Sequence, residues 1–151
     1  MKLATSDPVG FNDEKHVNNF INYLVRTDYT QKWTCEDTVY NAIALPKPNG
    51  EYIVDFCSSK LAERKLSAIS IKATVSKLLS DYSKDISSLE NSRYIIELEP
   101  GEILNKKDYK NCLLDISQYI NSLNKNEQTI CYTLHADQQD GLHVHRFYIN
   151  L

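Results

Sequence analysis

Two apolar runs near the end of the chain, residues 129–134 and 143–149, flank a Gly-containing loop, and three of the chain's four histidines lie in or directly after these runs. Each run has the length and apolar character of a strand. His143 and His145 stand two residues apart, so on a strand both imidazoles project from the same face. His135 directly follows the first run. At the end of a neighbouring strand it would bring a third imidazole nitrogen to the same point. Three neutral imidazoles with open positions opposite them can hold a divalent metal for catalysis. The pattern therefore predicts two adjacent strands and a metal site.

Length and composition place the chain among ordinary globular proteins. Its 151 residues suffice for one domain with a sizeable core, and 25% of them are charged and 42% apolar. No apolar stretch approaches the ~20 residues of a membrane span, and the start lacks the apolar core of a signal peptide. The four cysteines are scattered with no C-x-x-C, so we expect reduced thiols in a cytoplasmic protein without membrane partners. The net charge of −3 does not by itself indicate nucleic-acid binding.

The first half predicts a helix followed by a hairpin. Residues 1–13 contain Pro, Gly and Asn and are predicted to be irregular. Apolar positions then recur at helical spacing over residues 14–26, which predicts an amphipathic helix. Residues 27–38 are predicted to be a loop. Two apolar runs, 39–45 and 52–57, flank a turn that contains Asn-Gly, as in a β-hairpin.

The second half predicts a sheet covered by helices. Residues 61–89 favour one or two helices, and residues 93–99 alternate as a strand does before Pro-Gly ends the run. Residues 108–123 repeat apolar positions at helical spacing. We therefore predict one α/β (α+β) domain whose central antiparallel sheet contains 93–99, 129–135 and 142–149. The helix over 108–123 is expected to cover one face.

This second half resembles the HUH endonucleases, and specifically the plasmid relaxases of the MobA/VirD type, which nick one DNA strand at a transfer or replication origin. Those domains carry a His at the end of one central strand and an H-x-H on its neighbour. The family pattern H-x-D…H-x-H…N is matched here by His135, Asp137, His143, His145 and Asn150. The resemblance covers about residues 14–30 and 92–150. Relaxase domains usually run on after the last motif strand, so the resemblance implies a truncated or minimal member.

The resemblance also implies a tyrosine nucleophile on or near an N-terminal helix, in a Y-[LI]-x-R context. Tyr23 in Asn-Tyr-Leu-Val-Arg matches it, and Tyr29 is the reserve candidate. The tyrosine would store the phosphodiester bond as a link to the 5′ end of the cut strand. One divalent ion on the three histidines (Mn, Mg, Zn or another) would offset charge on the phosphate. Asp137 would either orient an imidazole or accept the tyrosine proton, and the sequence leaves both roles open.

The predicted partners are single-stranded DNA at an origin hairpin and, by the resemblance, accessory mobilisation proteins. Arg26, Lys32 and Arg146 are candidate phosphate contacts, and Trp33 and Tyr29 can stack on unpaired bases. Alternatively, the three basic residues are ordinary solvated surface charges, and the two aromatic side chains anchor a loop. Tyr23 could equally be a core residue with a wet hydroxyl.

Two other functions also fit the sequence. One is a relaxase-like module that binds DNA or protein without cutting and keeps the histidine cluster. The other is an unrelated enzyme with a histidine-bound metal. The sequence argues against two such folds: no Glu follows the H-x-H as in cupins, and Arg146-Phe147 replaces the D-H of the metallo-β-lactamase signature.

Overall fold

The computed structural model describes residues 1–28, 38–138 and 141–151. Its centre is a seven-stranded antiparallel sheet with the strand order β1-β5-β7-β6-β3-β4, and β2 also pairs with β5. The strands are β1 (Lys2–Thr5), β2 (Val9–Gly10), β3 (Ala42–Pro46), β4 (Tyr52–Phe56), β5 (Leu89–Glu97), β6 (Glu127–His135) and β7 (His143–Asn150). The long helices are α1 (Glu14–Leu24), α3 (Leu61–Asp81) and α4 (Tyr109–Leu123), and two 3-10 helices span Ile86–Ser88 and Lys106–Asp108. The predicted α+β class, an antiparallel sheet with flanking helices, is confirmed.

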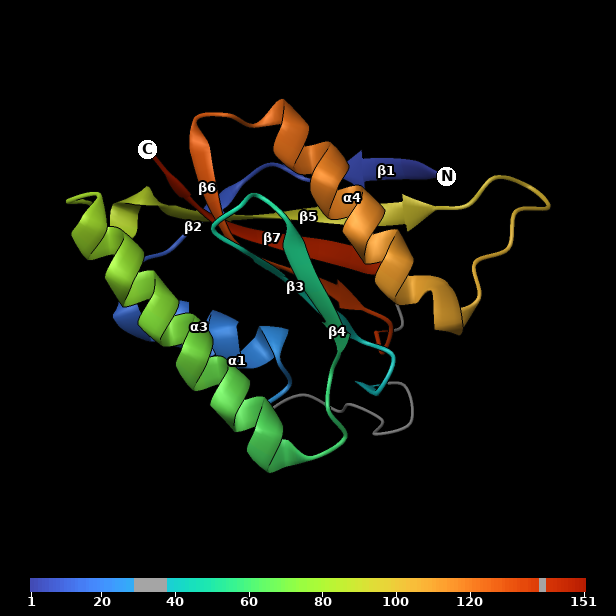
Figure 1. Ribbon diagram of the computed structural model, residues 1–151, viewed down its shortest axis with the longest axis horizontal. Helices are drawn as coiled ribbons and strands as arrows, with labels where there is room; N and C mark the ends of the chain where they lie inside the picture. The colour runs from blue at the N-terminus through green and yellow to red at the C-terminus, as the bar shows by residue number, and fades with distance from the viewer. Residues whose placement is uncertain (29–37, 139–140) are drawn as a thin grey trace.

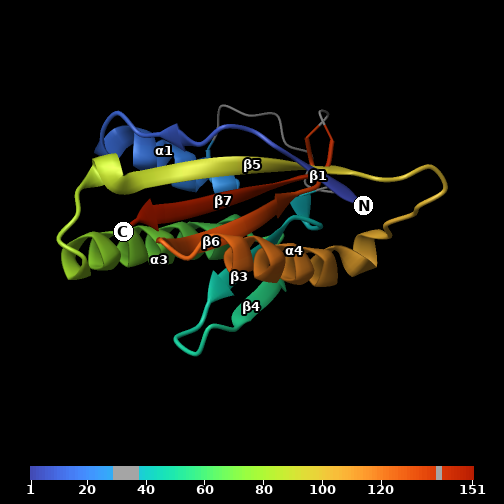
Figure 2. The same ribbon diagram turned by 90° about the horizontal axis from the view of Figure 1, so that it is seen from above.

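Helices cover both faces of this sheet. On one face, α1 and α3 pack against each other and bury Ile21 and Ile71 with Phe147 of β7. On the other face, α4 buries Ile116 against a cluster that includes Val144. In both views α3 and α4 flank the β3–β4 hairpin from opposite sides (Figures 1 and 2). Apolar side chains on both faces of the central strands therefore pack in a hydrophobic layer between the sheet and a helix.

The apolar runs at 129–134 and 143–149 form the two central strands of the sheet, β6 and β7. Both strands are buried along nearly their whole length, because each has a strand neighbour on either side and a helix layer on either face. Strands in such positions are nearly continuously apolar rather than alternating. Their antiparallel register sets His135 opposite His143 and Thr133 opposite His145. The prediction that these two runs are adjacent strands is confirmed.

The elements of the first half also follow from local sequence. Helix α1 begins where the Asp13 side chain accepts a hydrogen bond from the backbone N–H of His16 (2.8 Å), as N-cap residues do. The predicted hairpin is present as β3 and β4. Its turn holds Gly50 at φ 86°, a left-handed conformation that glycine adopts at no steric cost.

Several predicted boundaries were wrong. Residues 1–13 are not wholly irregular, because β1 and β2 add to the free edge of β5. Strand β5 starts at Leu89 instead of residue 93, since its first residues pair with the end of β7, and it stops at Glu97. Residues 61–89 hold one long helix that ends at Asp81, and Ser83 at φ 52° turns the chain away. The edge strands β1 and β2 escaped prediction because they are only four and two residues long and carry no long apolar pattern.

Candidate metal centre

The three histidines converge at one end of the sheet, on the face that α1 covers. His135 is the last residue of β6, and His143 and His145 open β7. One ring nitrogen of each imidazole lies within 4.8 Å of the corresponding nitrogens of the other two. The ring centroids stand 4.9–5.3 Å apart, and the three residues are 0%, 0% and 6% exposed. The prediction that these imidazoles surround one point is confirmed.

Hydrogen bonds fix which nitrogen of each ring carries the lone pair. His135 Nε2 lies 2.9 Å from the backbone oxygen of Leu24, and His143 Nδ1 lies 2.9 Å from that of Gly141. A carbonyl oxygen only accepts, so both of these nitrogens must be protonated and donate. The lone pairs then reside on His135 Nδ1 and His143 Nε2. Carbonyl partners of this kind orient metal-binding imidazoles and set their tautomers.

The third imidazole follows the same pattern through Tyr23. The Tyr23 hydroxyl donates to Gln138 Oε1 at 2.8 Å and lies 3.3 Å from His145 Nε2. Because its proton is already directed at Gln138, the hydroxyl accepts from His145 Nε2, which leaves the lone pair on His145 Nδ1. Neither this nitrogen nor His135 Nδ1 has a hydrogen-bond partner among the described residues, although both are buried. Buried polar atoms without partners are uncommon, and a bound cation is one group that satisfies them.

Burial also favours the neutral form of two of these rings. It lowers the pKa of His135 and of His145 well below the ordinary value, and the neighbouring arginine and histidine side chains lower it further. A neutral imidazole is the form that binds a metal. The donor set, the tautomers and the protonation states therefore fit one borderline divalent ion such as Zn, Mn, Co or Ni.

Helix α1 brings Tyr23 to this cluster. Its ring meets the edges of His135 and His145 at centroid distances of 5.2 and 5.4 Å. The carbonyl of Leu24 that holds His135 lies in the last turn, where helix carbonyls lack intrahelical partners. Burial raises the pKa of the Tyr23 phenol, and the charge of Arg26 with the bond to Gln138 offsets only part of that rise. Gln138 is a site residue that sequence reasoning missed, because nothing distinguishes it from other loop glutamines.

Arg26 ends α1 in an unusual conformation. Its φ is 61°, and it occupies the left-handed position of a Schellman motif, in which Thr27 N donates to Asn22 O (2.9 Å) and Arg26 N to Tyr23 O (3.4 Å). This position usually holds glycine. The Arg26 guanidinium lies 4.8 Å from the Tyr23 ring centroid and donates to the Tyr23 carbonyl at 2.7 Å. The side chain therefore fastens the end of the helix that presents Tyr23.

Asp137 binds this arginine, and neither role predicted for its carboxylate fits its position. Its oxygens accept from Arg26 Nη2 (2.7 Å) and Nε (2.9 Å), from Thr38 (3.0 Å) and from Asn41 (2.9 Å). Burial would raise the Asp137 pKa, but these bonds and the charge of Arg26 bring it below its ordinary value. A carboxylate held this way is a weak base and is committed to the guanidinium. Arg26, in turn, is not a surface phosphate contact, since its side chain is 1% exposed.

Arg146 was also wrongly assigned to DNA. It alternates with His143 and His145 along β7, so it points into the opposite face, where it is 1% exposed. Its guanidinium donates to Thr129 (3.1 Å) and binds Glu127. Asn150, the last motif residue, lies at the far end of β7 and donates to Glu90. Tyr29, Lys32 and Trp33 lie outside the described residues, so their predicted roles stay predictions.

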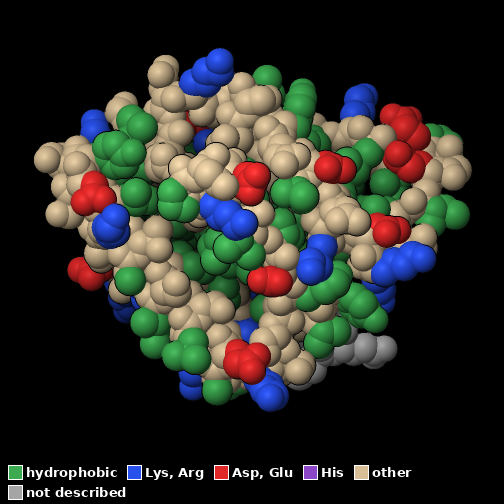
Figure 3. Space-filling model, viewed as in Figure 1, with side chains coloured by type: hydrophobic (Ala, Val, Ile, Leu, Met, Phe, Trp, Pro, Cys, Tyr) green, Lys and Arg blue, Asp and Glu red, His purple; other side chains and the backbone are tan. Residues whose placement is uncertain are grey.

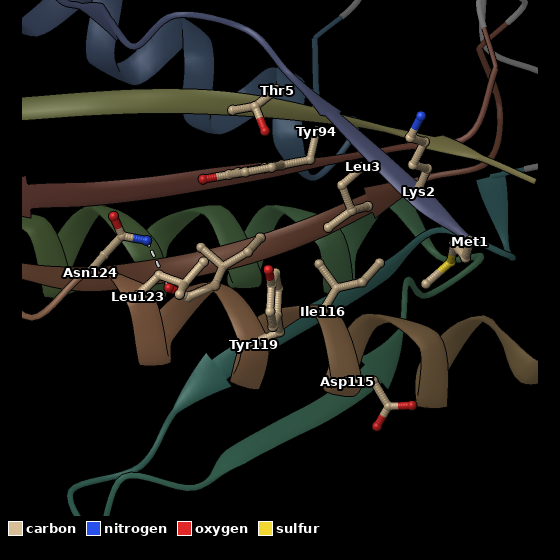
Figure 4. A pocket seen from close by; sticks show the side chains of 11 residues that line it. Met1, Lys2, Leu3, Thr5, Tyr94, Asp115, Ile116, Tyr119, Leu123 and Asn124 are labelled. Carbon is tan, nitrogen blue, oxygen red and sulfur yellow. Dashed lines mark hydrogen bonds between the residues drawn. The ribbon is translucent and has the colours of Figure 1, made fainter.

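A cavity of about 570 Å³ lies on that opposite face, away from the histidines. Leu3 of β1, Tyr94 of β5 and Tyr119 of α4 line it, and Figure 4 shows Tyr94 directed into it. Its lining contains none of the predicted site residues. The face drawn in Figure 3 mixes Lys and Arg with Asp and Glu, and no histidine shows on it. Within the described part of the chain, no helix is both long and apolar enough to cross a membrane.

Comparison of the chain with protein-family models, with curated proteins and with solved structures finds no match.

Proposed function

We propose that the protein is a metal-dependent endonuclease and strand transferase acting on single-stranded DNA, in the manner of a relaxase at a transfer or replication origin. One observation carries the proposal: a tyrosine hydroxyl lies 3.3 Å from a ring nitrogen of a buried three-histidine cluster. A phenol can store a phosphodiester bond, and the cluster has the donors to hold a cation beside it. Their proximity is what a transesterification of this class needs.

The chemistry assigns a role to each residue. The Tyr23 oxygen attacks the phosphorus, the new O–P bond forms, and the bond to the 3′ oxygen breaks. The phenol proton passes to solvent water, and the departing 3′ oxygen takes a proton from water. A divalent ion on His135, His143 and His145 would polarise the non-bridging oxygens of the phosphate. Gln138 and His145 orient the phenol oxygen, and the His145 Nε2–H donates to that oxygen as its negative charge develops.

A second candidate function is a module that binds DNA or protein through this site without cutting. Two observations favour it. The net charge is −3, and burial raises the Tyr23 pKa, which leaves less of the phenol ionised at neutral pH. This alternative keeps the metal site and removes the covalent step.

A covalent-adduct assay separates the two functions. The protein is incubated with Mn²⁺ and a 5′- and 3′-labelled library of single-stranded oligonucleotides, and adducts are detected on denaturing gels and by mass spectrometry. We expect an adduct to the 5′ end of the cut strand, and its loss in Tyr23→Phe with Mn²⁺ affinity retained. Tyr148→Phe is the matched control, because it removes a hydroxyl that donates to Glu90 on the opposite face.

Two outcomes would contradict the assignment. Adduct formation by Tyr23→Phe with loss in Tyr29→Phe would move the nucleophile to Tyr29. Wild-type protein that binds the library but never forms an adduct would favour the binding module.

A further inference from the structure

Arg93 lies on the strand next to the histidine strand, and its side chain shares the face of the cluster. In the β5–β7 register, Arg93 stands directly opposite His145, and Ile95 stands opposite His143. Side chains of directly opposed residues on one face lie close together. The neighbouring Tyr94 points the other way, toward the cavity on the α4 face (Figure 4). The strand pairing therefore sets a guanidinium beside the candidate metal centre.

The contact between Arg93 and the cluster is not a hydrogen bond to a ligand nitrogen. Arg93 Nη2 lies 3.5 Å from His143 Nδ1, but that nitrogen already donates to the Gly141 carbonyl at 2.9 Å. Two donors that face one another do not share a proton. The strand pairing thus holds the Arg93 guanidinium near the imidazoles without a hydrogen bond to a ligand nitrogen.

Two arginines lie near the site, Arg26 beside the Tyr23 ring and Arg93 opposite His145. The Arg26 side chain is 1% exposed, whereas Arg93 is only half-buried. Of these two arginines, Arg93 is therefore the one that a substrate can reach.

We propose that Arg93 is a catalytic residue that binds a non-bridging oxygen of the scissile phosphodiester and offsets the charge that develops there. This inference rests on the proposed function and names the group that recognises its substrate. A planar guanidinium matches the oxygens of a phosphate, and a fixed donor is most effective where charge develops. Neutral imidazoles cannot supply this charge, and the Arg26 side chain is buried.

The test combines Arg93→Gln with a change in the substrate. The nick position is first mapped with wild type, and the scissile phosphate is then replaced by an uncharged methylphosphonate. On the natural phosphodiester we expect Arg93→Gln to slow adduct formation about 100-fold, the typical effect of removing one such donor. On the methylphosphonate, which lacks the charged oxygen, the same substitution should change the rate less than threefold. Arg93→Lys should be intermediate, since it keeps the charge but not the planar fork.

Two controls separate a direct contact from a structural effect. Lys77→Gln removes a positive charge from the outer surface of α3, where its side chain is 78% exposed, and should leave both rates unchanged. Mn²⁺ affinity and thermal stability of Arg93→Gln should match wild type. Loss of Mn²⁺ binding, or an equal slowing on both substrates, would overturn the proposal.

Binding distinguishes failure of this inference from failure of the proposed function. If wild type forms no adduct, fluorescence anisotropy with a mixed-sequence 20-mer still compares phosphodiester and methylphosphonate backbones in Mn²⁺. If Arg93→Gln binds the phosphodiester 20-mer more weakly than wild type does but binds the methylphosphonate equally well, Arg93 is a phosphate ligand in a protein that does not cleave. Equal binding of the phosphodiester by wild type and Arg93→Gln, or no binding by wild type, would overturn the proposal for Arg93.

Discussion

The Arg26–Asp137 and Arg146–Glu127 pairs lie on opposite faces of the sheet and are built alike. Each arginine is 1–2% exposed, binds a carboxylate and lies over a tyrosine ring, Arg26 at 4.8 Å from Tyr23 and Arg146 at 4.3 Å from Tyr148. Only the first pair adjoins the histidines. The comparison shows that a buried arginine pair alone does not mark a functional site, because this fold uses one on each face.

The backbone distinguishes the two pairs. Arg146 sits in regular strand β7, whereas Arg26 adopts φ 61°, which costs a non-glycine residue about 1–3 kcal/mol. Strain of this size persists where surrounding contacts fix the residue, and here those contacts also hold Tyr23. The strained residue, Arg26, therefore lies on the same face of the sheet as the histidine cluster.

The largest expected difference between the pairs is in stability. Asp137→Ala leaves the Arg26 charge buried without its carboxylate and should lower the free energy of unfolding by about 3–5 kcal/mol. Glu127 is 22% exposed, so water can reach the Arg146 end of that pair, and Glu127→Ala should lose only about 1–3 kcal/mol. Urea unfolding of both variants measures the difference. Equal losses would show that the two pairs are energetically equivalent.

A smaller difference in the free energy of unfolding should distinguish the backbone at Arg26 from that at Arg146. In an Asp137→Asn background, adding Arg26→Gly removes the unpaired charge and places glycine at its preferred left-handed position, so we expect about 1–2 kcal/mol to be regained. In a Glu127→Gln background, adding Arg146→Gly should instead destabilise, because glycine weakens a central strand. Matched urea titrations of the four proteins give both changes. If glycine raised the free energy of unfolding at both positions, or at neither, the strain assigned to Arg26 would be contradicted.

This contrast also explains what could be predicted from sequence. The period of two placed His143 and His145 on one face, and the family resemblance pointed to Tyr23, which does lie beside them. Arg26 and Arg146 could not be told apart, since burial depends on which helix end and which sheet face receives each side chain. Asp137 was predicted either to orient an imidazole or to accept the tyrosine proton, but the turn after β6 directs it to Arg26.

Other site residues depend on strand register, which the sequence does not contain. Arg93 shares the face of the cluster only because β5 pairs with β7 as it does. Gln138 reaches the Tyr23 hydroxyl across a separation of 115 residues, and no local pattern marks it. The edge strands β1 and β2 are four and two residues long, too short to give an alternating signal.

Anomalous diffraction from crystals grown with Zn²⁺ or Mn²⁺ tests the central claim most directly, that the three histidines form a metal centre beside Tyr23. We predict one anomalous peak within the cluster, bound by His135 Nδ1, His143 Nε2 and His145 Nδ1 at about 2.0–2.2 Å for a transition metal. The carbonyls of Leu24 and Gly141 should keep their bonds to the opposite ring nitrogens. A dataset with no peak at the histidines, or one in which those ring nitrogens bind only water, would contradict the account.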